Sequence, residues 1–331
     1  MGCKILVLAE HEEGAVRGIT WELLGLAHGL LGGAGWGPGD VKALLAGNGV
    51  ESLASTVAAR GAAEVICVEG PALAGYTGDA FHRAIEAVVK SESPEMLLIG
   101  HTPDGWDVAP LVAAGLGVPV ATECSAIAVD NGRLRFTRKV FNGKFVQVVD
   151  MEATRPLVAT IQKGAAAAHT GTTQGTVRKV PSPVQEADLR ARFIEVKKGA
   201  AGAVDLTQAP IIVAGGRGLG AADKFNVIRE LADALGAQIG ASRPVTDMGW
   251  LPHEHQVGSS GVTVSPKLYI ACGISGAIQH TAGMRGSGYV VAINKDADAP
   301  IFDVSDIGVV GDLFEIVPAL TKAVKEAKGK G

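Results

Sequence analysis

Short apolar runs alternate with helical patterns along the first part of the chain, and this alternation leaves few folds open to it. The apolar runs cover residues 3–10, 41–46, 64–68 and 96–100, and the helical patterns cover residues 18–31, 50–60, 79–90 and 106–116. Short strands separated by helices are typical of right-handed βαβ units on a parallel sheet. The sequence therefore predicts an α/β domain built on a doubly wound parallel sheet.

From residue 121 the alternation changes, because four strand-like segments follow one another without a helix between them. These segments cover residues 126–129, 133–141, 144–149 and 156–161. Asn142-Gly143 lies between the second and the third, and Asn-Gly supplies the positive φ angles of a type I′ hairpin turn. We therefore expect an antiparallel extension of the first sheet.

A Gly/Ala-rich stretch at residues 198–208 is typical of a linker between domains. Before it, residues 164–183 are small and polar, and residues 189–197 are predicted to form one more strand. We therefore expect an N-terminal α/β domain over residues 1–200 and a C-terminal domain over residues 201–331.

The C-terminal domain repeats the α/β pattern. A strand is predicted at 211–214, followed by a glycine-rich turn at 215–220 and a helix that ends at Gly236. Further strands are predicted at 268–271 and 290–293, and a closing helix at 313–328. This is a second doubly wound parallel sheet, of the flavodoxin or Rossmann type, in which ligands bind at the carboxyl ends of the strands.

The segment Leu268–His280, L-Y-I-A-C-G-I-S-G-A-I-Q-H, is the strongest indication of a ligand site. The pattern predicts a strand, a tight turn at Gly273, and a helix that Ser275-Gly276 opens and that carries Gln279 and His280. Such a turn leaves backbone N–H groups and the positive end of a helix dipole facing an electron-rich ligand. The same pattern also fits an ordinary βα turn, in which glycine only permits the chain to reverse.

Other polar loops are expected at the strand ends of the same domain. Arg217 lies inside the glycine-rich turn, where a phosphate would use it. Arg243 precedes Pro244, and a loop of small residues follows at 257–261. Together the loops describe a polar cleft for an extended dinucleotide. Because no Ser–His–Asp elbow, cysteine nucleophile or supported carboxylate pair stands out, the cleft is predicted to hold a cofactor rather than to turn over a substrate.

Composition excludes several classes of protein. The net charge is −4 without a basic block, so a nucleic-acid partner is not expected. No apolar stretch has membrane-spanning length, so no membrane insertion is expected, and because an apolar run begins by Cys3, no signal or transit peptide is expected either. The four cysteines form no C-x-x-C pair, and His253-Glu254-His255 lacks a further ligand nearby, so no metal site is predicted. Buried thiols favour a reducing, cytoplasmic location.

The order of these loops closely resembles the alpha subunit of electron transfer flavoproteins. The resemblance rests on G-G-R-G-L, G-A-S-R, V-G-S-S-G, G-I-S-G-A-I-Q-H, A-I-N-K-D and G-D-L-F, and it covers residues 210–320. It implies a heterodimer with a beta subunit and an FAD held mainly by the second domain of the alpha subunit. It also implies an electron carrier that takes electrons from acyl-CoA dehydrogenase-type donors and delivers them to an acceptor such as a membrane quinone oxidoreductase.

The resemblance also implies which residues contact FAD. Arg243 is expected over the isoalloxazine ring, His280 near the ring O2 and the Ser260 hydroxyl near N5, and these three are expected to set the redox chemistry. Asn294, Asp312 and Leu313 match positions at the adenosine end. The remaining expected contacts are Arg217, Ser242, Val257, Gly258, Ser259, Ser275, Gly276, Ala277, Ile278 and Gln279.

One departure from the family pattern lies in the small-residue loop. The family usually reads V-G-Q-T-G, whereas this chain has Ser259 and Ser260 at the third and fourth positions. The hydroxyl is kept but the glutamine side chain is lost, so the flavin potential or the fit to a partner is expected to differ.

Three alternatives stay open from the sequence. The first is an NAD(P)-binding dehydrogenase domain, although the clean G-x-G-x-x-G that it predicts is missing. The second is an adenine-nucleotide sensor, which would be colourless. The third is the alpha subunit of an electron-bifurcating, NADH-linked flavoprotein, whose second flavin site would be built largely by the beta subunit.

Overall fold

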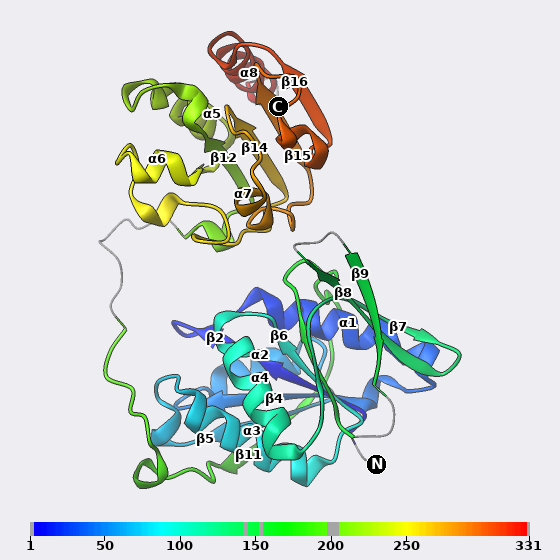
Figure 1. Ribbon diagram of the computed structural model, residues 1–331. Coiled ribbons are helices and arrows are strands. Elements are labelled where there is room, and N and C mark those ends of the chain that lie inside the picture. The colour runs from blue at the N-terminus through cyan, green and yellow to red at the C-terminus, as the bar shows by residue number, and fades with distance from the viewer. Residues whose placement is uncertain (1–2, 142–144, 152–154, 197–204, 330–331) are drawn as a thin grey trace. The chain divides into compact units, whose positions relative to one another are not determined.

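The computed structural model describes residues 3–141, 145–151, 155–196 and 205–329 of the chain. It divides the chain into two compact units, Met1–Val196 and Lys197–Gly331 (Figure 1). The predicted turn at Asn142-Gly143 and most of the predicted 198–208 linker lie outside the described residues. Each unit is an α/β layered structure, which confirms the predicted fold class.

The first unit contains a sheet in the order β11-β5-β4-β1-β6-β10-β7-β8-β9. Its strands are β1 (Ile5–Ala9), β4 (Val41–Gly47), β5 (Glu64–Glu69), β6 (Met96–Gly100), β7 (Val120–Asp130), β8 (Arg133–Val140), β9 (Phe145–Asp150), β10 (Leu157–Ile161) and β11 (Thr176–Pro181). The strands from β11 to β7 in this order run parallel to one another. β8 pairs antiparallel with both β7 and β9. A small hairpin of β2 (His11–Glu12) and β3 (Ala15–Val16) stands apart from it.

Helices cover both faces of the first sheet. They are α1 (Gly18–Ala34), α2 (Glu51–Ala58), α3 (Gly78–Glu92) and α4 (Pro103–Leu116). Successive residues of β1 point to opposite faces, so Ile5 and Val7 pack in the core with α1 and α2 while Leu6 and Leu8 pack with α3 and α4. A strand buried on both faces reads as a continuous apolar run, which is why β1 was predicted from sequence.

The antiparallel extension is smaller than predicted. β8 and β9 form it with β7, but β10 lies between β6 and β7 and is parallel to both. A run of strands without helices was therefore a misleading signal, because the chain returns from β9 into the middle of the parallel sheet.

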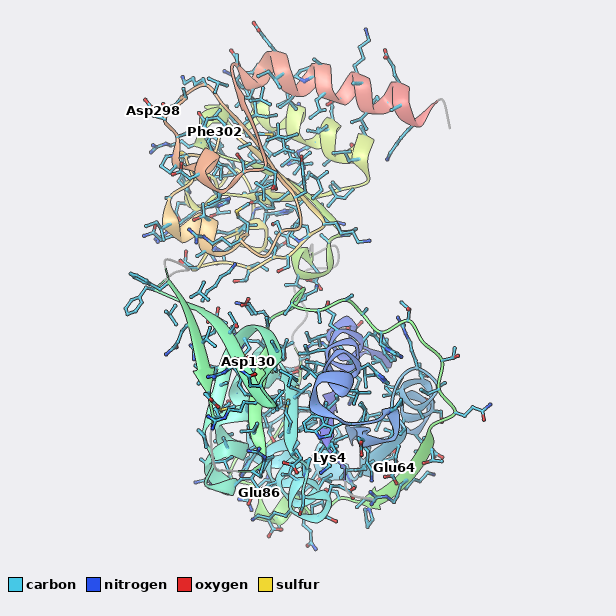
Figure 2. All side chains as sticks on the ribbon, turned by 90° about the vertical axis from the view of Figure 1, so that its right-hand side faces the viewer. Lys4, Glu64, Glu86, Asp130, Asp298 and Phe302 are labelled. Carbon is cyan, nitrogen blue, oxygen red and sulfur yellow. The ribbon has the colours of Figure 1, made fainter. Side chains whose placement is uncertain are left out.

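One strand prediction near the end of the first unit was wrong, and one strand was not predicted. Residues 189–196, the described part of the predicted strand, form no strand, and the Ile194 side chain is 88% exposed. Instead β11 forms within the small, polar stretch at residues 164–183, where no strand was predicted, and it pairs in parallel with β5. Arg178 of β11 binds Glu64 at 2.7 Å and Glu92 at 2.6 Å, which stabilises this polar edge strand (Glu64 is labelled in Figure 2).

The second unit contains five parallel strands in the order β13-β12-β14-β15-β16. They are β12 (Ile211–Gly215), β13 (Gln238–Ala241), β14 (Leu268–Cys272), β15 (Val290–Asn294) and β16 (Ile307–Val310). This is the flavodoxin-like order, and it contains β13 and β16 in addition to the three strands that the sequence analysis lists.

One face of the second sheet packs against α5 (Asn226–Leu235), α6 (Arg243–Asp247) and α8 (Leu313–Lys328). The other face packs against loops and the 3₁₀ turn Pro300–Val304, and His280 of α7 (Ile278–Ala282) contacts Tyr269 on that face. Further 3₁₀ turns are Pro38–Asp40, Pro71–Leu73, Glu186–Asp188, Leu206–Gln208, Arg217–Leu219, Asp223–Phe225 and His253–His255. Helix α8 has the bounds that the sequence predicted.

Candidate functional site

The loops after β12 and β14 meet at the point where the strand order of the second sheet reverses. The Gly216 N–H donates to the Cys272 carbonyl at 2.9 Å, and the Gly218 N–H donates to the Gly273 carbonyl at 3.0 Å. A Cβ atom on Gly216 would lie 2.2 Å from the Gly273 carbonyl oxygen, so a side chain cannot fit between the loops. The two glycine-containing turns predicted from sequence therefore form one floor at the carboxyl edge of the sheet, where ligands bind in this class of fold.

The turn from Ser275 to His280 differs from the prediction in its helix. α7 begins at Ile278 rather than at Ser275 and contains five residues. Gly276 has φ +87°, which reverses the chain before the helix begins, and a Cβ there would lie 2.2 Å from the Ile301 nitrogen. The expectation of a helix dipole at Ser275-Gly276 was wrong, because a contact with Ile301, distant in sequence, decides the conformation.

The small-residue loop packs directly on α7. The Ser259 N–H donates to the Gln279 carbonyl at 2.7 Å. Gly258 has φ +145°, and a Cβ there would lie 2.7 Å from the same carbonyl oxygen. Val257 is buried, and its N–H donates to the Ala241 carbonyl at 2.9 Å, which ties the loop to the end of β13.

Gln256 holds the Ser260 hydroxyl in place, and sequence reasoning missed it. Its side chain is buried, and its Nε2 donates to Ser260 Oγ at 3.0 Å. Its Oε1 accepts from the Thr246 hydroxyl at 2.6 Å. A glutamine directly before V-G-S-S-G was the available signal, because a buried amide needs partners for both of its ends.

Two exposed cationic side chains follow the carboxyl ends of β12 and β13. Arg217 follows β12 and is exposed, and no ion pair is found for it among the described residues. Arg243 begins α6 after the buried Ser242, and its Nε binds Asp247 at 3.2 Å, with both side chains largely exposed. No hydrogen bond within the described ranges joins Arg217 or Arg243 to His280. Arg217, Arg243 and His280 therefore lie on three separate segments, which follow β12, β13 and β14.

His280 and Tyr269 form a buried polar pair on the face opposite α5 and α8. The Tyr269 hydroxyl lies 3.0 Å from His280 Nε2, and the exposed fractions of the two residues are 0% and 6%. Burial lowers the pKa of His280 to about 4, although the backbone of Val257 favours the protonated ring. The imidazole is therefore neutral at pH 7. Its Nδ1 is buried and completes no hydrogen bond with any described residue.

Three predicted contacts have structural roles of their own. The Asn294 amide donates to the Ile274 carbonyl at 2.9 Å, which holds the turn after β14 against the end of β15. Asp312 caps α8 by accepting from the Phe314 N–H at 2.8 Å. Leu313 is buried, and its side chain approaches Gly273.

The lowered pKa of His280 predicts a pH dependence of stability. Between its ordinary pKa of 6.5 and about 4, the unfolded chain binds a proton that the folded chain does not. The free energy of unfolding therefore does not depend on this group above pH 6.5, and it falls as the pH drops from 6.5 toward 4. At about 1.4 kcal/mol per pKa unit, the loss is roughly 3 kcal/mol. Denaturant unfolding at pH 7 and pH 4 should show this extra loss in the wild type relative to His280→Gln. Equal losses in the two proteins would contradict a buried, uncharged ring.

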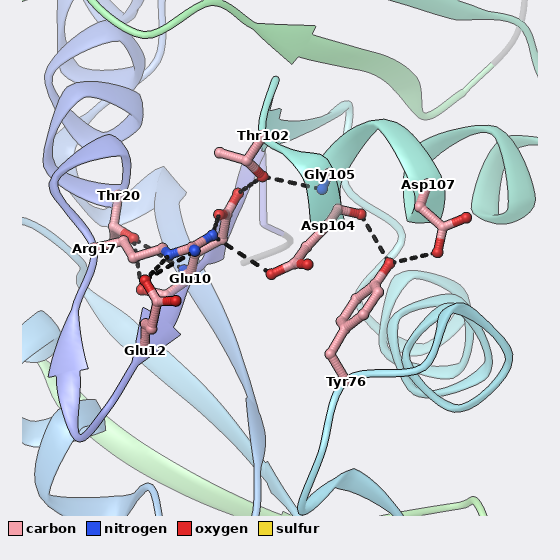
Figure 3. Close-up of polar contacts among 9 residues, drawn as sticks. All are labelled: Glu10, Glu12, Arg17, Thr20, Tyr76, Thr102, Asp104, Gly105 and Asp107. Carbon is pink, nitrogen blue, oxygen red and sulfur yellow. Dashed lines mark hydrogen bonds and ion pairs between the residues drawn. The ribbon is translucent and has the colours of Figure 1, made fainter. Parts of the chain in front are cut away.

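The corresponding edge of the first sheet is filled by charged side chains instead of glycine loops (Figure 3). Glu10 follows β1 and is 7% exposed, and Thr102 precedes α4 and donates to Glu10 Oε1 at 3.0 Å. Arg17 binds Glu10 at 3.3 Å and Asp104 at 3.5 Å. Burial raises the pKa of both Glu10 and Asp104. Because carboxylates repel phosphate, this edge is a poor site for a nucleotide, and the second unit carries the better one.

Two negative findings apply to the described ranges alone. In residues 3–141, 145–151, 155–196 and 205–329, no group of three or more His, Cys, Asp or Glu side chains could hold a metal ion. Over the same ranges, no helix has the length and apolar character needed to cross a membrane.

Comparisons with known proteins agree with the division into two units. Residues 5–185 match the family described as the electron transfer flavoprotein domain, and residues 205–285 match the electron transfer flavoprotein FAD-binding domain. Asn294, Asp312 and Leu313 lie outside the second match.

Several curated proteins are similar to this chain over almost their whole length. The electron transfer flavoprotein subunit alpha of Thermoanaerobacterium thermosaccharolyticum is 42% identical over 327 residues, which are 98% of each chain. The protein of the same name from Bacillus subtilis is 40% identical over 98% of each chain. Protein FixB of Clostridium saccharobutylicum is 38% identical over 97% of this chain and 96% of its own.

Proposed function

Because this chain belongs to the family of electron transfer flavoprotein alpha subunits, we propose that it carries electrons between flavoprotein dehydrogenases and a downstream acceptor as part of a heterodimer. The cofactor is FAD, since residues 205–285 form the FAD-binding domain of the family. The donors are acyl-CoA dehydrogenase-type flavoproteins of fatty acid β-oxidation, and the acceptor is a quinone oxidoreductase-type protein. The second subunit is an electron transfer flavoprotein beta subunit, and the complex works in the cytoplasm.

The carboxyl edge of the second sheet has the features that an FAD needs. The observation that carries the assignment is the buried Nδ1 of His280, which completes no hydrogen bond with any described residue. A buried polar atom without a partner is costly unless a ligand supplies one. The close approach of Gly216 and Gly273 leaves room for backbone but not for side chains, and Arg217 supplies a positive charge for a pyrophosphate.

The predicted contact residues would hold different parts of the cofactor. Arg217, Asn294, Asp312 and Leu313 would serve its pyrophosphate and adenosine end, and the segments Val257–Ser260 and Ser275–His280 its flavin end. FAD supplies one-electron and two-electron redox chemistry at its isoalloxazine ring. We further propose that residues 201–331 form this FAD-binding domain and that residues 1–200 contact the beta subunit.

The residues at the flavin end would control how readily negative charge is accepted there. Arg243 supplies a full positive charge from an exposed position, partly offset by Asp247. His280 is neutral at pH 7 and would act through a hydrogen bond rather than as a cation. The Ser260 hydroxyl is oriented by Gln256 and offers a further hydrogen bond. We therefore assign the stabilisation of negative charge on the flavin to Arg243, and the orientation of the flavin by hydrogen bonds to His280 and Ser260.

Replacing Arg243 by alanine is expected to lower the one-electron reduction potential of the bound flavin. A unit charge about 4 Å away is worth about 1 kcal/mol in water and about 4 kcal/mol at an effective dielectric of 20. At 59 mV per tenfold change these limits are roughly 40 and 170 mV, and the exposure of Arg243 favours the lower half of that range. A spectroelectrochemical titration measures the change. Arg229→Ala on the exposed side of α5 removes the same charge and should leave the potential unchanged; equal shifts in both variants would exclude a local role.

The choice of electron donor can be tested on the complex with the beta subunit. The purified complex should be yellow, and its absorption should bleach when an acyl-CoA dehydrogenase and its substrate are added without oxygen. Bleaching by NADH alone, together with two flavins per heterodimer, would support the electron-bifurcating alternative instead. If neither the acyl-CoA dehydrogenase with its substrate nor NADH bleached the flavin, the assignment to β-oxidation would be refuted.

A further inference from the structure

Tyr269 is a buried tyrosine in β14, the central strand of the second sheet, where aliphatic residues are the rule. It lies in β14 with an exposed fraction of 0%, among the apolar residues on the face opposite α5 and α8. A buried tyrosine hydroxyl needs a hydrogen-bond partner. The partner is His280 Nε2 at 3.0 Å, and the structure gives this hydroxyl no other bond within the described residues.

The pair restricts the tautomer of His280. A neutral imidazole carries its proton on one nitrogen and accepts at the other. If Nε2 carried the proton, the Tyr269 hydrogen would have no acceptor and Nδ1 would present a bare lone pair in a buried position. If the Tyr269 hydroxyl donates to Nε2, its hydrogen is used and Nδ1 becomes an N–H donor. The second arrangement leaves fewer buried polar groups unpaired.

We propose that Tyr269 is a positioning residue that fixes His280 in the Nδ1–H tautomer, so that His280 presents a hydrogen-bond donor to the electron-rich edge of the flavin. This inference rests on the proposed function for the identity of the acceptor, but the assignment of the tautomer does not. A fixed donor strengthens its bond as charge accumulates on the acceptor, whereas a lone pair would repel that charge. Tyr269 thereby acts on the flavin through His280.

The test uses the complete heterodimer labelled with ¹⁵N-histidine, in the wild type, in Tyr269→Phe and in Thr321→Val. Tyr269→Phe removes only the hydroxyl and keeps the buried ring. Thr321→Val is the matched control, because it removes a buried hydroxyl that bonds the Val317 carbonyl at 2.8 Å within α8. The chain has eight histidines, so the signals of His280 are assigned by their loss in His280→Gln. Two-bond ¹⁵N correlation spectra then show which ring nitrogen carries the proton.

We expect the wild type and Thr321→Val to show the Nδ1–H tautomer, and Tyr269→Phe to show a mixture or the other tautomer. We also expect Tyr269→Phe to lose about a tenfold preference for reduced over oxidised flavin, which is about 59 mV in a one-electron potential. An unchanged tautomer in Tyr269→Phe, or an Nε2–H tautomer in the wild type, overturns the proposal.

The two proposals fail separately in this experiment. A complex that binds no FAD would refute the proposed function, while the histidine spectra would still decide the role of Tyr269. A complex that binds FAD with the same tautomer in both proteins would refute only the role of Tyr269. A potential that shifts equally in Thr321→Val would also count against it, because that result would show a general effect of lost stability.

Discussion

Replacing Gly276 by alanine is expected to abolish retention of FAD and to destabilise the second unit by several kcal/mol. The backbone of Gly276 has φ +87°, where an L-residue costs about 1–2 kcal/mol. The new methyl group would also lie 2.2 Å from the Ile301 nitrogen and 2.5 Å from its Cα, and overpacking typically costs about 1–3 kcal/mol. The turn must then move away from Ile301, and the segment that carries Gln279 and His280 moves with it.

The control for this variant is Gly236→Ala, at the end of α5 and outside the loops assigned to FAD. Gly236 has φ +69° but no atom within 4 Å of the position of a Cβ, so alanine there meets backbone strain without a clash. Thermal unfolding and the flavin content of the purified complex should show a small loss for Gly236→Ala and a large one for Gly276→Ala. Equal effects would mean that the packing of Gly276 on Ile301 does not shape the site.

Replacing Arg17 by methionine is expected to destabilise the first unit by about 3 kcal/mol, the lower end of the cost of breaking a buried ion pair. Arg17 binds Glu10, Glu12 and Asp104, and Glu10 is 7% exposed (Figure 3). Without the guanidinium, Glu10 would be a buried carboxylate with only the Thr102 hydroxyl as a partner for its Oε1. Denaturant unfolding at pH 7 measures the loss.

The sign of the pH dependence separates this explanation from a simple loss of packing. Burial already raises the pKa of Glu10, and removal of Arg17 should raise that pKa further. The folded state then binds a proton that the unfolded state has lost, so the stability of Arg17→Met should recover as pH falls from 7 toward 5. Lys179→Met, which removes an ion pair with Glu51 in which both side chains are more than half exposed, should cost less than about 1 kcal/mol at either pH. A deficit of Arg17→Met that does not change with pH would contradict the electrostatic account.

The sequence predicted the elements that are determined by residues close together in the chain. β1, β4, β5 and β6 are apolar runs bounded by turns, and α8 begins at an aspartate cap and ends in a lysine-rich turn. These signals lie within a few residues of each other, so periodicity and capping rules detect them.

Elements that depend on distant contacts were missed or misplaced. β11 is polar, and Arg178 binds Glu64 and Glu92, which lie far away in the sequence. β10 follows two antiparallel strands but enters the parallel sheet, which no local pattern indicates. α7 begins late because Gly276 packs on Ile301. In the site, the loops were predicted from their glycines and arginines, whereas the bonds of Gln256 to Ser260 and of Tyr269 to His280 emerge only once the fold is known.

The measurement closest to the central claim is the flavin content of the complex purified with its beta subunit. Heat or acid should release FAD, identified by chromatography, at one mole per mole of alpha chain, and Gly276→Ala should release much less while Arg17→Met, after correction for folded protein, releases as much as the wild type. A second mole of flavin that survives Gly276→Ala would be assigned to the beta subunit. A colourless complex that takes up no FAD on reconstitution, or full FAD content in Gly276→Ala, would contradict a flavin site at the carboxyl edge of the second sheet.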